Sequence, residues 1–193
     1  MEIHNPKEFA TKISDVSECA FERAIILGEY SILDGKRVDW LDIEIPVAQS
    51  GKPRDICLDL IGKDEDGRYV LCELKFRRRS EDNGNPREAA DQLNGYLESI
   101  KNHYETLGQH SNARGKIDWE AVANGATRLV IAANHRYWDS WYGPRRPKGE
   151  YVPSGEFECY SVNVNQDIFA KQKGSNATYT PNMPDDAKVW ERR

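Results

Sequence analysis

The sequence contains no long apolar run. Its longest apolar segments are short, such as Leu129 to Ala133, and fall well below the roughly 20 residues that a membrane-spanning helix requires. The first residues, Met1 to Lys12, are charged and lack the apolar stretch of a secretion signal. We therefore expect a cytoplasmic protein that does not cross a membrane.

Cysteine and histidine are scarce, with four of each among 193 residues. Cys19, Cys57, Cys72 and Cys159 are far apart and form no C-x-x-C pair, and the histidines add no spacing typical of zinc ligands. This pattern indicates reduced, mostly buried thiols. It does not predict a structural zinc.

An excess of positive charge is also absent. The chain has 27 Lys and Arg against 32 Asp and Glu, a net charge of -5, which argues against a protein that coats nucleic acid by general attraction. It argues less against a nuclease, because bound metal ions offset carboxylates and basic residues can act locally. Two local basic clusters are present: Lys75 with Arg77, Arg78 and Arg79, and Arg145 and Arg146 with Lys148.

The apolar periodicity predicts one domain over residues 1–170 and an irregular tail, rich in Pro, Asn and Asp, over residues 171–193. The order of its main elements is α-β-β-β-α-β, which predicts an α/β fold with a mixed sheet flanked by helices. These elements are a helix at 9–27, strands at 41–47, 54–61 and 68–76, a helix at 86–107 and a buried strand at 128–133. A short helix at 117–123 and a last strand at 156–164 are also expected.

The hairpin at residues 54–76 carries two carboxylates that we expect to meet. Asp59 lies opposite Glu73 if the Asp66-Gly67 turn is centred on Asp66, and directly opposed side chains on one face are about 5 Å apart. Two like charges at that separation repel and raise each other's pKa, and a cation between them removes the conflict. Carboxylate oxygens are the ligands that Mg²⁺ prefers, so the pair predicts a Mg²⁺ or Mn²⁺ site.

Lys75 lies two residues beyond Glu73, on the same face of the strand. Its ammonium group can neutralise a phosphate oxygen or orient an attacking water. Phosphodiester hydrolysis needs a metal that polarises the phosphate and positive charge for the developing negative charge. The three side chains together therefore predict a metal-dependent phosphodiester hydrolase.

Asp59, the hairpin and the run Glu73-Leu74-Lys75 resemble the Asp…(Asp/Glu)-x-Lys motif of PD-(D/E)XK nucleases. Gln92 and Tyr96, on the next helix, are similar to the Gln-x-x-x-Tyr motif of RecB-like members of that superfamily. Residues four apart share a helix face, so both side chains can reach toward the site. The resemblance covers residues 18–133.

The resemblance implies a restriction-endonuclease-like core and a catalytic set of Asp59, Glu73, Lys75, Gln92 and Tyr96. In that family the Asp and Glu hold the divalent metal with help from the carbonyl of the middle residue, here Leu74, and the Lys assists catalysis. Many members also carry an acidic residue on the first helix near the metal. Glu22 or Glu18 matches that position.

Several of these residues also allow plainer interpretations. Asp55 shares a strand face with Asp59 and is an alternative metal ligand. Gln92 and Tyr96 are also suited simply to packing and capping their helix. Arg77, Arg78 and Arg79 either contact the phosphate backbone of nucleic acid or form a solvated loop. Tyr137, Trp138, Trp141 and Tyr142 either stack on bases or belong to the core or a subunit interface.

The sequence therefore predicts a Mg²⁺-dependent nuclease whose partner is nucleic acid, with DNA as the first choice. The alternative is a binding module of the same fold, with weak or absent catalysis, inside a larger complex. A third interpretation is an unrelated α/β fold with a structural hairpin. The pattern leaves open DNA against RNA, the cleavage mode, and whether the chain forms a homodimer.

Overall fold

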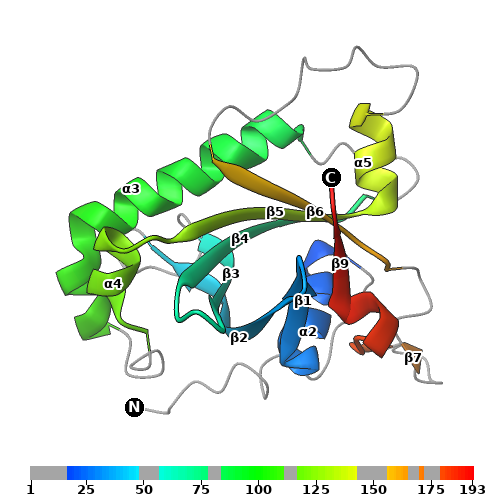
Figure 1. Cartoon of the computed structure of the whole chain (residues 1–193), viewed down its shortest axis with the longest axis horizontal. Coiled ribbons are helices and arrows are strands. Elements are labelled where there is room, and N and C mark those ends of the chain that lie inside the picture. Colours follow the sequence, from blue (N-terminus) through cyan, green and yellow to red (C-terminus); the bar gives the residue numbers. More distant parts are fainter. Residues whose placement is uncertain are drawn as a thin grey trace.

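The chain forms a mixed sheet that closes on itself, with helices on both of its faces (Figure 1). The computed structural model describes residues 17–47, 57–77, 84–110, 117–142, 156–164, 170–171 and 179–193. The strands of the closed sheet, in spatial order, are β1 (Tyr30–Leu33), β2 (Lys36–Pro46), β3 (Cys57–Asp64), β4 (Tyr69–Lys75), β5 (Arg128–Asn134), β6 (Phe157–Val162) and β9 (Val189–Arg192). The other elements are α2 (Glu18–Gly28), α3 (Pro86–His110), α4 (Trp119–Asn124), α5 (His135–Tyr142), the 3-10 helix η2 (Asp185–Lys188) and the small pair β7 (Ala170–Lys171) and β8 (Tyr179–Thr180).

The pairing of the strands changes direction halfway around the sheet. Strands β1 to β4 form antiparallel pairs, and β4, β5 and β6 run parallel to one another. Strand β9 closes the ring through a parallel pair with β1 and an antiparallel pair with β6. The parallel step from β4 to β5 is made through α3 and α4, as a parallel connection requires.

The prediction of an open, restriction-endonuclease-like α/β sheet is wrong, because the structure has a closed seven-strand mixed barrel. Two strands account for the difference. Strand β1 pairs with β2 across a tight turn in which Asp34 and Gly35 both have positive φ, 52° and 78°, as an Asp-Gly hairpin turn requires. Strand β9 comes from the tail that was expected to be irregular, and its Trp190 is buried against Trp40 with ring centroids 5.4 Å apart.

The inner face of the sheet packs against α2. We call this cluster the inner core; its larger members are Phe21, Ile25, Ile26, Leu33, Val38, Trp40, Ile43, Leu60, Val70, Leu74, Val130, Tyr160 and Trp190. The predicted helix at 9–27 is confirmed from Glu18 onward and ends at Gly28. Residues 9–16 lie outside the described part of the chain.

The outer face packs against α3, α4 and α5. We call this cluster the outer core; it includes Ile45, Leu58, Ile61, Leu71, Leu93, Tyr96, Ile100, Trp119, Ile131, Tyr137 and Trp138. The predicted helix at 86–107 is confirmed as α3, and its apolar stripe, with Ala89, Leu93, Tyr96 and Ile100, is buried. The aromatic run is helix α5, and its Tyr137, Trp138 and Trp141 are buried, so the packing interpretation of these rings is the correct one.

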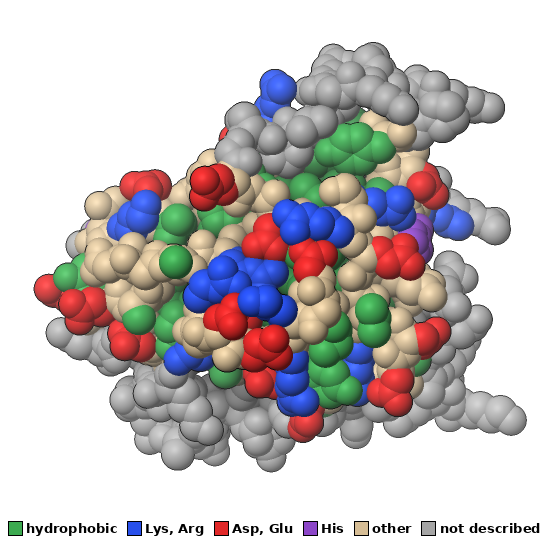
Figure 2. All heavy atoms as spheres, in the orientation of Figure 1, with side chains coloured by type: hydrophobic (Ala, Val, Ile, Leu, Met, Phe, Trp, Pro, Cys, Tyr) green, Lys and Arg blue, Asp and Glu red, His purple; other side chains and the backbone are tan. Residues whose placement is uncertain are grey.

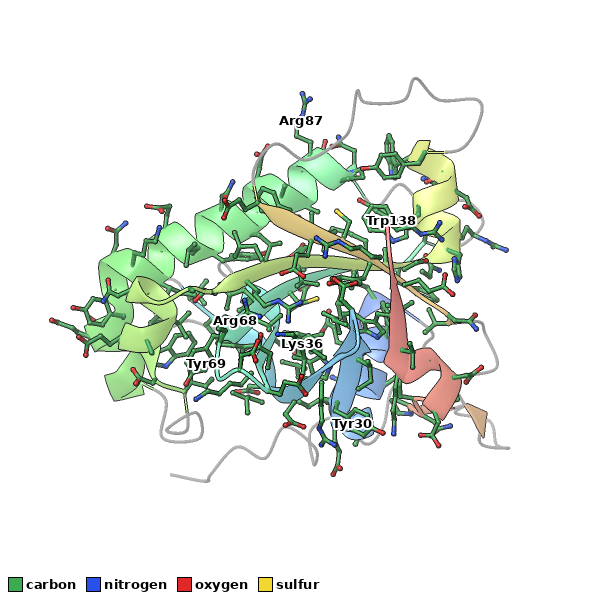
Figure 3. The ribbon with its side chains drawn as sticks, viewed as in Figure 1. Tyr30, Lys36, Arg68, Tyr69, Arg87 and Trp138 are labelled. Carbon is green, nitrogen blue, oxygen red and sulfur yellow. The ribbon has the colours of Figure 1, made fainter. Side chains whose placement is uncertain are left out.

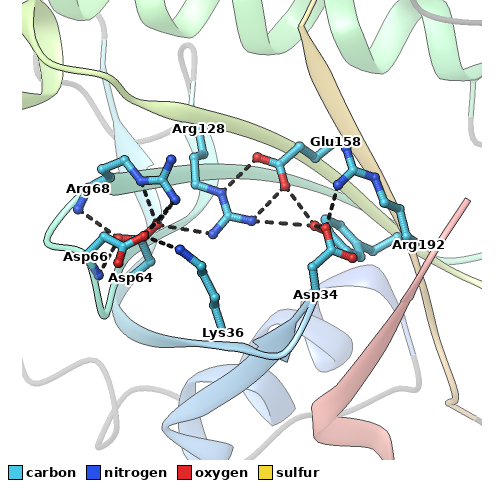
Figure 4. A network of polar contacts seen from close by, with 9 residues as sticks. Asp34, Lys36, Asp64, Asp66, Arg68, Arg128, Glu158 and Arg192 are labelled. Carbon is cyan, nitrogen blue, oxygen red and sulfur yellow. Dashed lines mark hydrogen bonds and ion pairs between the residues drawn. The ribbon is translucent and has the colours of Figure 1, made fainter.

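Charged side chains gather at the end of the barrel that carries the β3–β4 turn (Figure 4). Arg128 joins Asp64 on β3, at 3.3 Å, to Glu158 on β6, at 2.6 Å. Tyr160 then donates to Asp34 in the β1–β2 turn. Lys36 and Arg68 both point toward Asp66 (Figure 4), whereas Arg87 extends away from α3 (Figure 3). Positive side chains therefore alternate with negative ones on this face (Figure 2).

No helix among the described residues combines the length and the apolar character needed to cross a membrane.

Candidate metal centre

The centre lies at the open end of the β3–β4 hairpin, away from its turn. The pair of the hairpin ladder farthest from the turn joins Leu60 to Cys72, and the same register puts Asp59 opposite Glu73 at the next step. The register expected from the Asp66-Gly67 turn is therefore confirmed. The Asp59 carboxylate accepts a hydrogen bond of 2.7 Å from the backbone amide of Leu74, which holds it across the end of β4.

Glu73 and Lys75 lie side by side on β4. Nζ of Lys75 is 2.6 Å from Oε1 of Glu73, and Lys75 and Glu73 are only 8% and 2% exposed, respectively. The other oxygen of Glu73, Oε2, is buried and has no partner in hydrogen-bonding geometry within the described chain. A buried carboxylate oxygen without a partner is costly, so this atom is well suited to a cation.

The strands turn sharply at this point. Ile43 and Leu60 are paired and pack in the inner core, whereas the next pair, Ile45 and Leu58, packs in the outer core. The residue between the two isoleucines, Glu44, has a φ of 49°, a conformation that is rare outside glycine and clusters at functional sites. An alternating strand at 54–61 would put Leu58 and Leu60 on one face, but β2 and β3 change the faces they present at Glu44 and Asp59.

Helix α2 brings two more carboxylates to the centre. Glu18 Oε2 accepts a 2.8 Å hydrogen bond from the amide of Phe76, just past β4. One turn later, Glu22 is buried among the apolar residues of the helix, at 6% exposed. Its Oε2 has no hydrogen-bond partner in the described residues. Of the two candidates on the first helix, Glu22 is thus the one with a vacant oxygen.

The carboxyl groups of the centre oppose each other's ionisation. Burial and the charges of Glu44, Glu18 and Glu73 raise the pKa of Glu22 to about 8. Burial and the charges of Glu73 and Glu22 raise the pKa of Asp59 well above its usual value. Burial also raises the pKa of Glu73, although Lys75 acts in the opposite direction. Without a cation, Glu22 retains its proton near neutral pH, and the protonated forms of Asp59 and Glu73 are favoured more than in free carboxyl groups.

Lys75 remains charged in this setting. Burial favours its neutral form, but the charges of Glu73, Glu18 and Asp59 outweigh burial and raise the pKa of Lys75. The ammonium group therefore carries a permanent positive charge beside the carboxylates.

Helix α3 covers one side of the centre. Tyr96 is buried, and burial together with the charges of Glu73 and Asp59 raises its pKa. Gln92, one turn earlier, is exposed and lines a cavity of about 470 Å³ together with Lys75. The remaining lining residues are Gly84, Glu88 and Asp91. The structure thus brings Gln92 and Tyr96 to the same centre as Glu73 and Lys75.

The basic loop after β4 is described only at its first residue. A guanidinium nitrogen of Arg77 donates to Ser140 Oγ on α5 at 2.7 Å, and its backbone amide donates to Asn134 Oδ1. Arg77 therefore connects β4 to α5. The other two arginines, Arg78 and Arg79, lie outside the described residues, as do Asp55 and the cluster of Arg145, Arg146 and Lys148.

Two further residues near the centre have no motif in the sequence that marks them. Cys19 Sγ donates to Glu44 Oε1 at 3.2 Å, and ligand atoms of Cys19, Glu22 and Glu44 lie within 4.8 Å of one another. Cys19 and Glu44 are 25 residues apart, so no local spacing connects them. Glu44 sits in an alternating Ile-Glu-Ile run that is typical of a solvated strand face.

Comparison with models of known families, with curated proteins and with solved structures finds no significant match to this chain.

Proposed function

We propose that the chain is a divalent-metal-dependent nuclease that hydrolyses phosphodiester bonds, with DNA as its substrate, and that its centre works as in PD-(D/E)XK nucleases. The observation that carries the proposal is that Asp59 and Glu73, opposed at the open end of the hairpin, lie beside the charged Lys75. Glu22 on α2 is close enough for its charge to raise the pKa of Asp59. Glu22 Oε2 is buried without a hydrogen-bond partner in the described chain, and Glu73 Oε2 has none in good geometry, although Tyr96 and Asp59 approach the Glu73 carboxyl and lower its pKa. In an ion pair that serves only stability, the buried carboxylate oxygens normally have hydrogen-bond partners. An oxygen without one is therefore better explained as a metal ligand.

The donor set fits a hard cation. Asp59, Glu73 and Glu22 offer carboxylate oxygens, which Mg²⁺ and Mn²⁺ prefer, and the proton that Glu22 holds would leave on binding. In PD-(D/E)XK nucleases the backbone carbonyl of the residue that Leu74 matches is a further oxygen ligand of the metal, and Leu74 would supply it here. When bound, such a cation supplies a Lewis acid for the phosphate and an activated water.

Lys75 supplies positive charge to the reacting phosphate. Its ammonium is held by Glu73 at 2.6 Å and lines the same cavity as Gln92. A fixed ammonium in a partly dry site stabilises the negative charge that develops on phosphate oxygens. Gln92 and Tyr96, from one face of α3, orient the substrate and the Glu73 carboxylate.

The cavity itself is not a phosphate site without a cation. Glu88 and Asp91 line it with Lys75, and Glu88 is held by hydrogen bonds from Asn85. Two carboxylates at the entrance repel a phosphodiester. Substrate binding at the centre should therefore depend on the metal as strongly as catalysis does.

Cleavage of plasmid DNA tests the proposal. Wild-type protein should cleave in Mg²⁺ or Mn²⁺ and stop on chelation, and Asp59→Asn should lose both cleavage and Mn²⁺ affinity in calorimetric titration. Asp185→Asn, on an exposed side chain of η2, is the matched control and should behave as wild type. Loss of Mn²⁺ affinity in Asp55→Asn but not in Asp59→Asn would identify Asp55 as the ligand instead.

The alternative, a binding module with the same centre, has a distinct outcome. Such a protein would bind Mn²⁺ through Asp59 and retain DNA in a gel-shift assay, but would leave the plasmid intact in every metal. Cleavage that is unchanged by chelation would reject both versions, because each depends on the carboxylate cluster.

A further inference from the structure

A second group of metal-ligating side chains lies next to the proposed nuclease centre. It consists of Cys19 and Glu22 on α2 and Glu44 on β2, with one ligand atom of each within 4.8 Å of the others. The thiol of Cys19 donates to Glu44 Oε1 at 3.2 Å. These residues come from two elements that pack directly on each other, so the fold itself fixes their separation.

The cluster has a feature that a structural hydrogen bond does not explain. Glu22 is 94% buried, since only 6% of it is exposed, and its Oε2 has no partner among the described residues. The hydrogen bond to Glu44 satisfies the thiol of Cys19. Glu22 adds a further carboxyl group to this pair. A buried carboxylate oxygen without a donor costs free energy unless a cation or a proton meets it.

We propose that Cys19, Glu22 and Glu44 form a transition-metal site that binds Zn²⁺. A thiolate ligand favours Zn²⁺ over Mg²⁺, which takes oxygen ligands and keeps its waters. One sulfur and two carboxylate oxygens are three of the four ligands of tetrahedral Zn²⁺, and the fourth position is left for water or a substrate oxygen. Tetrahedral bonds of about 2.3 Å to sulfur and 2.0–2.2 Å to oxygen would place these two atoms about 3.6 Å apart. The 3.2 Å of the present hydrogen bond is therefore within a few tenths of an ångström of that separation.

Binding requires the Cys19 proton to leave. The S–H bond breaks, its electron pair stays on sulfur and forms the S–Zn bond, and the proton passes through the hydrogen-bonded Glu44 carboxylate to solvent. Burial, the hydrogen bond to Glu44 and the charge of Glu22 keep the pKa of the free thiol at about 12. Zn²⁺ must therefore displace the proton, and affinity should rise with pH.

This site is separate from the nuclease centre but shares Glu22 with it. Glu22 also faces the charge of Glu73, so one carboxylate can serve both positions. The inference does not depend on the proposed nuclease activity, because it concerns binding of an ion by Cys19 and Glu44.

Cobalt(II), which occupies zinc sites and is visible by spectroscopy, provides the test. Wild-type protein titrated with Co²⁺ should develop a thiolate-to-metal charge-transfer band in the near ultraviolet, and Zn²⁺ should abolish it by displacement. Cys19→Ser should lose the band and lower Zn²⁺ affinity by more than about 100-fold, which exceeds the effect of changing a ligand's supporting partner. Cys159→Ser, a half-buried cysteine on β6, should keep the band.

The nuclease variant separates this proposal from the previous one. Asp59→Asn should keep the charge-transfer band, whatever the outcome of the plasmid assay. Absence of the band in wild-type protein, its persistence in Cys19→Ser, or its loss in Asp59→Asn would overturn a separate Cys19 site.

A measurement on wild-type protein tests the proposal even if the Cys19→Ser variant fails to fold. Zn²⁺ should slow alkylation of Cys19, followed by peptide mass spectrometry, by roughly tenfold or more, because a metal-bound thiolate is withdrawn from reaction. Cys159 should react at the same rate with and without Zn²⁺. Equal rates at Cys19 would overturn the proposal.

Discussion

Glu22 is the residue whose chemistry differs most from its sequence context. A glutamate in a helix is normally solvated, yet this one is 6% exposed and its pKa is raised to about 8. The acidic groups that raise it are Glu44 on β2, Glu18 on its own helix and Glu73 on β4, with Arg23 acting against them. Its protonation therefore reports whether a cation is present.

The metal-free protein should lose stability as pH rises. The folded state keeps the Glu22 proton up to a pKa of about 8, whereas the unfolded chain releases it near 4.5. Because the folded pKa is the higher one, the stabilisation is complete below 4.5 and disappears as pH rises toward about 8. A tenfold difference in proton affinity between the folded and unfolded states corresponds to about 1.4 kcal/mol of stability. The pKa values of Asp59 and Glu73 are also raised, so these groups change stability with pH in the same direction.

Urea denaturation in the presence of a chelator, repeated across this pH range, measures the effect. The free energy of unfolding should fall with pH in wild-type protein and fall less steeply in Glu22→Gln. Glu98→Gln, an exposed glutamate of α3, should retain the wild-type slope. A free energy of unfolding that rises over the range would contradict the buried, protonated state of Glu22.

The hairpin and the long helix could be predicted because their patterns are local. The Asp66-Gly67 turn sets the register of β3 and β4, and 25 residues of α3 carry one apolar stripe. Strand β1 has only four residues, too few for a clear alternation of apolar and polar positions before its Asp34-Gly35 turn. Nothing in the four residues of β9 predicts pairing with strands far away in the sequence.

The difference between local patterns and contacts of distant segments also explains which residues of the metal centre could be predicted. Asp59, Glu73 and Lys75 belong to one hairpin, so their meeting could be predicted from the register that its turn sets. Glu44 faces α2 because β2 switches faces at a residue with positive φ, and no strand pattern predicts that conformation for glutamate. The contact between Cys19 and Glu44 depends on how α2 packs on the sheet.

The loop after β4 should contribute unequally to nucleic-acid binding. Arg77 donates to Ser140 on α5, so Arg77→Ala should leave the salt dependence of DNA binding nearly unchanged and lower thermal stability instead. The double variant Arg78→Ala/Arg79→Ala should flatten the plot of log affinity against log salt by about two, at roughly 0.9 per lost phosphate contact.

Fluorescence anisotropy on a short duplex, in chelator to prevent cleavage, gives these slopes. A wild-type slope in the double variant would make the loop a solvated surface. The cluster of Arg145, Arg146 and Lys148 would then be the next candidate.

The two ends of the barrel carry different clusters of charged side chains. The carboxylate centre lies where β4 ends at Lys75, whereas Arg128 pairs with Val70 near the start of β4. Five residues of strand separate these levels by about 16 Å, enough for independent effects on stability and function. The network of Asp34, Asp64, Arg128, Glu158 and Arg192 connects the β1–β2 turn, β3, β5, β6 and β9 (Figure 4) and thus stabilises the closure of the sheet.

Arg128→Ala should therefore lower the free energy of unfolding by about 2 kcal/mol, because Asp64 and Glu158 lose the charged donor that they share but keep Arg68 and Tyr160, respectively. The proposed nuclease activity, per folded molecule, should not change. Chemical denaturation measures the loss, with Arg87→Ala on the exposed surface of α3 as a control expected within about 0.5 kcal/mol of wild type. Equal stability of the two variants would mean that the network does not support the barrel.

Single-turnover cleavage of DNA by Lys75→Met decides whether the centre is catalytic. Methionine preserves the buried stem of Lys75 and removes only the charge that faces the proposed phosphate site. Cleavage in saturating Mg²⁺ should slow by about 100- to 1000-fold, with Mn²⁺ affinity and thermal unfolding retained. Lys101→Met, whose exposed ammonium pairs with Glu98 on α3, should cleave at the wild-type rate. Cleavage by Lys75→Met at the wild-type rate would contradict a nuclease centre built on Asp59, Glu73 and Lys75.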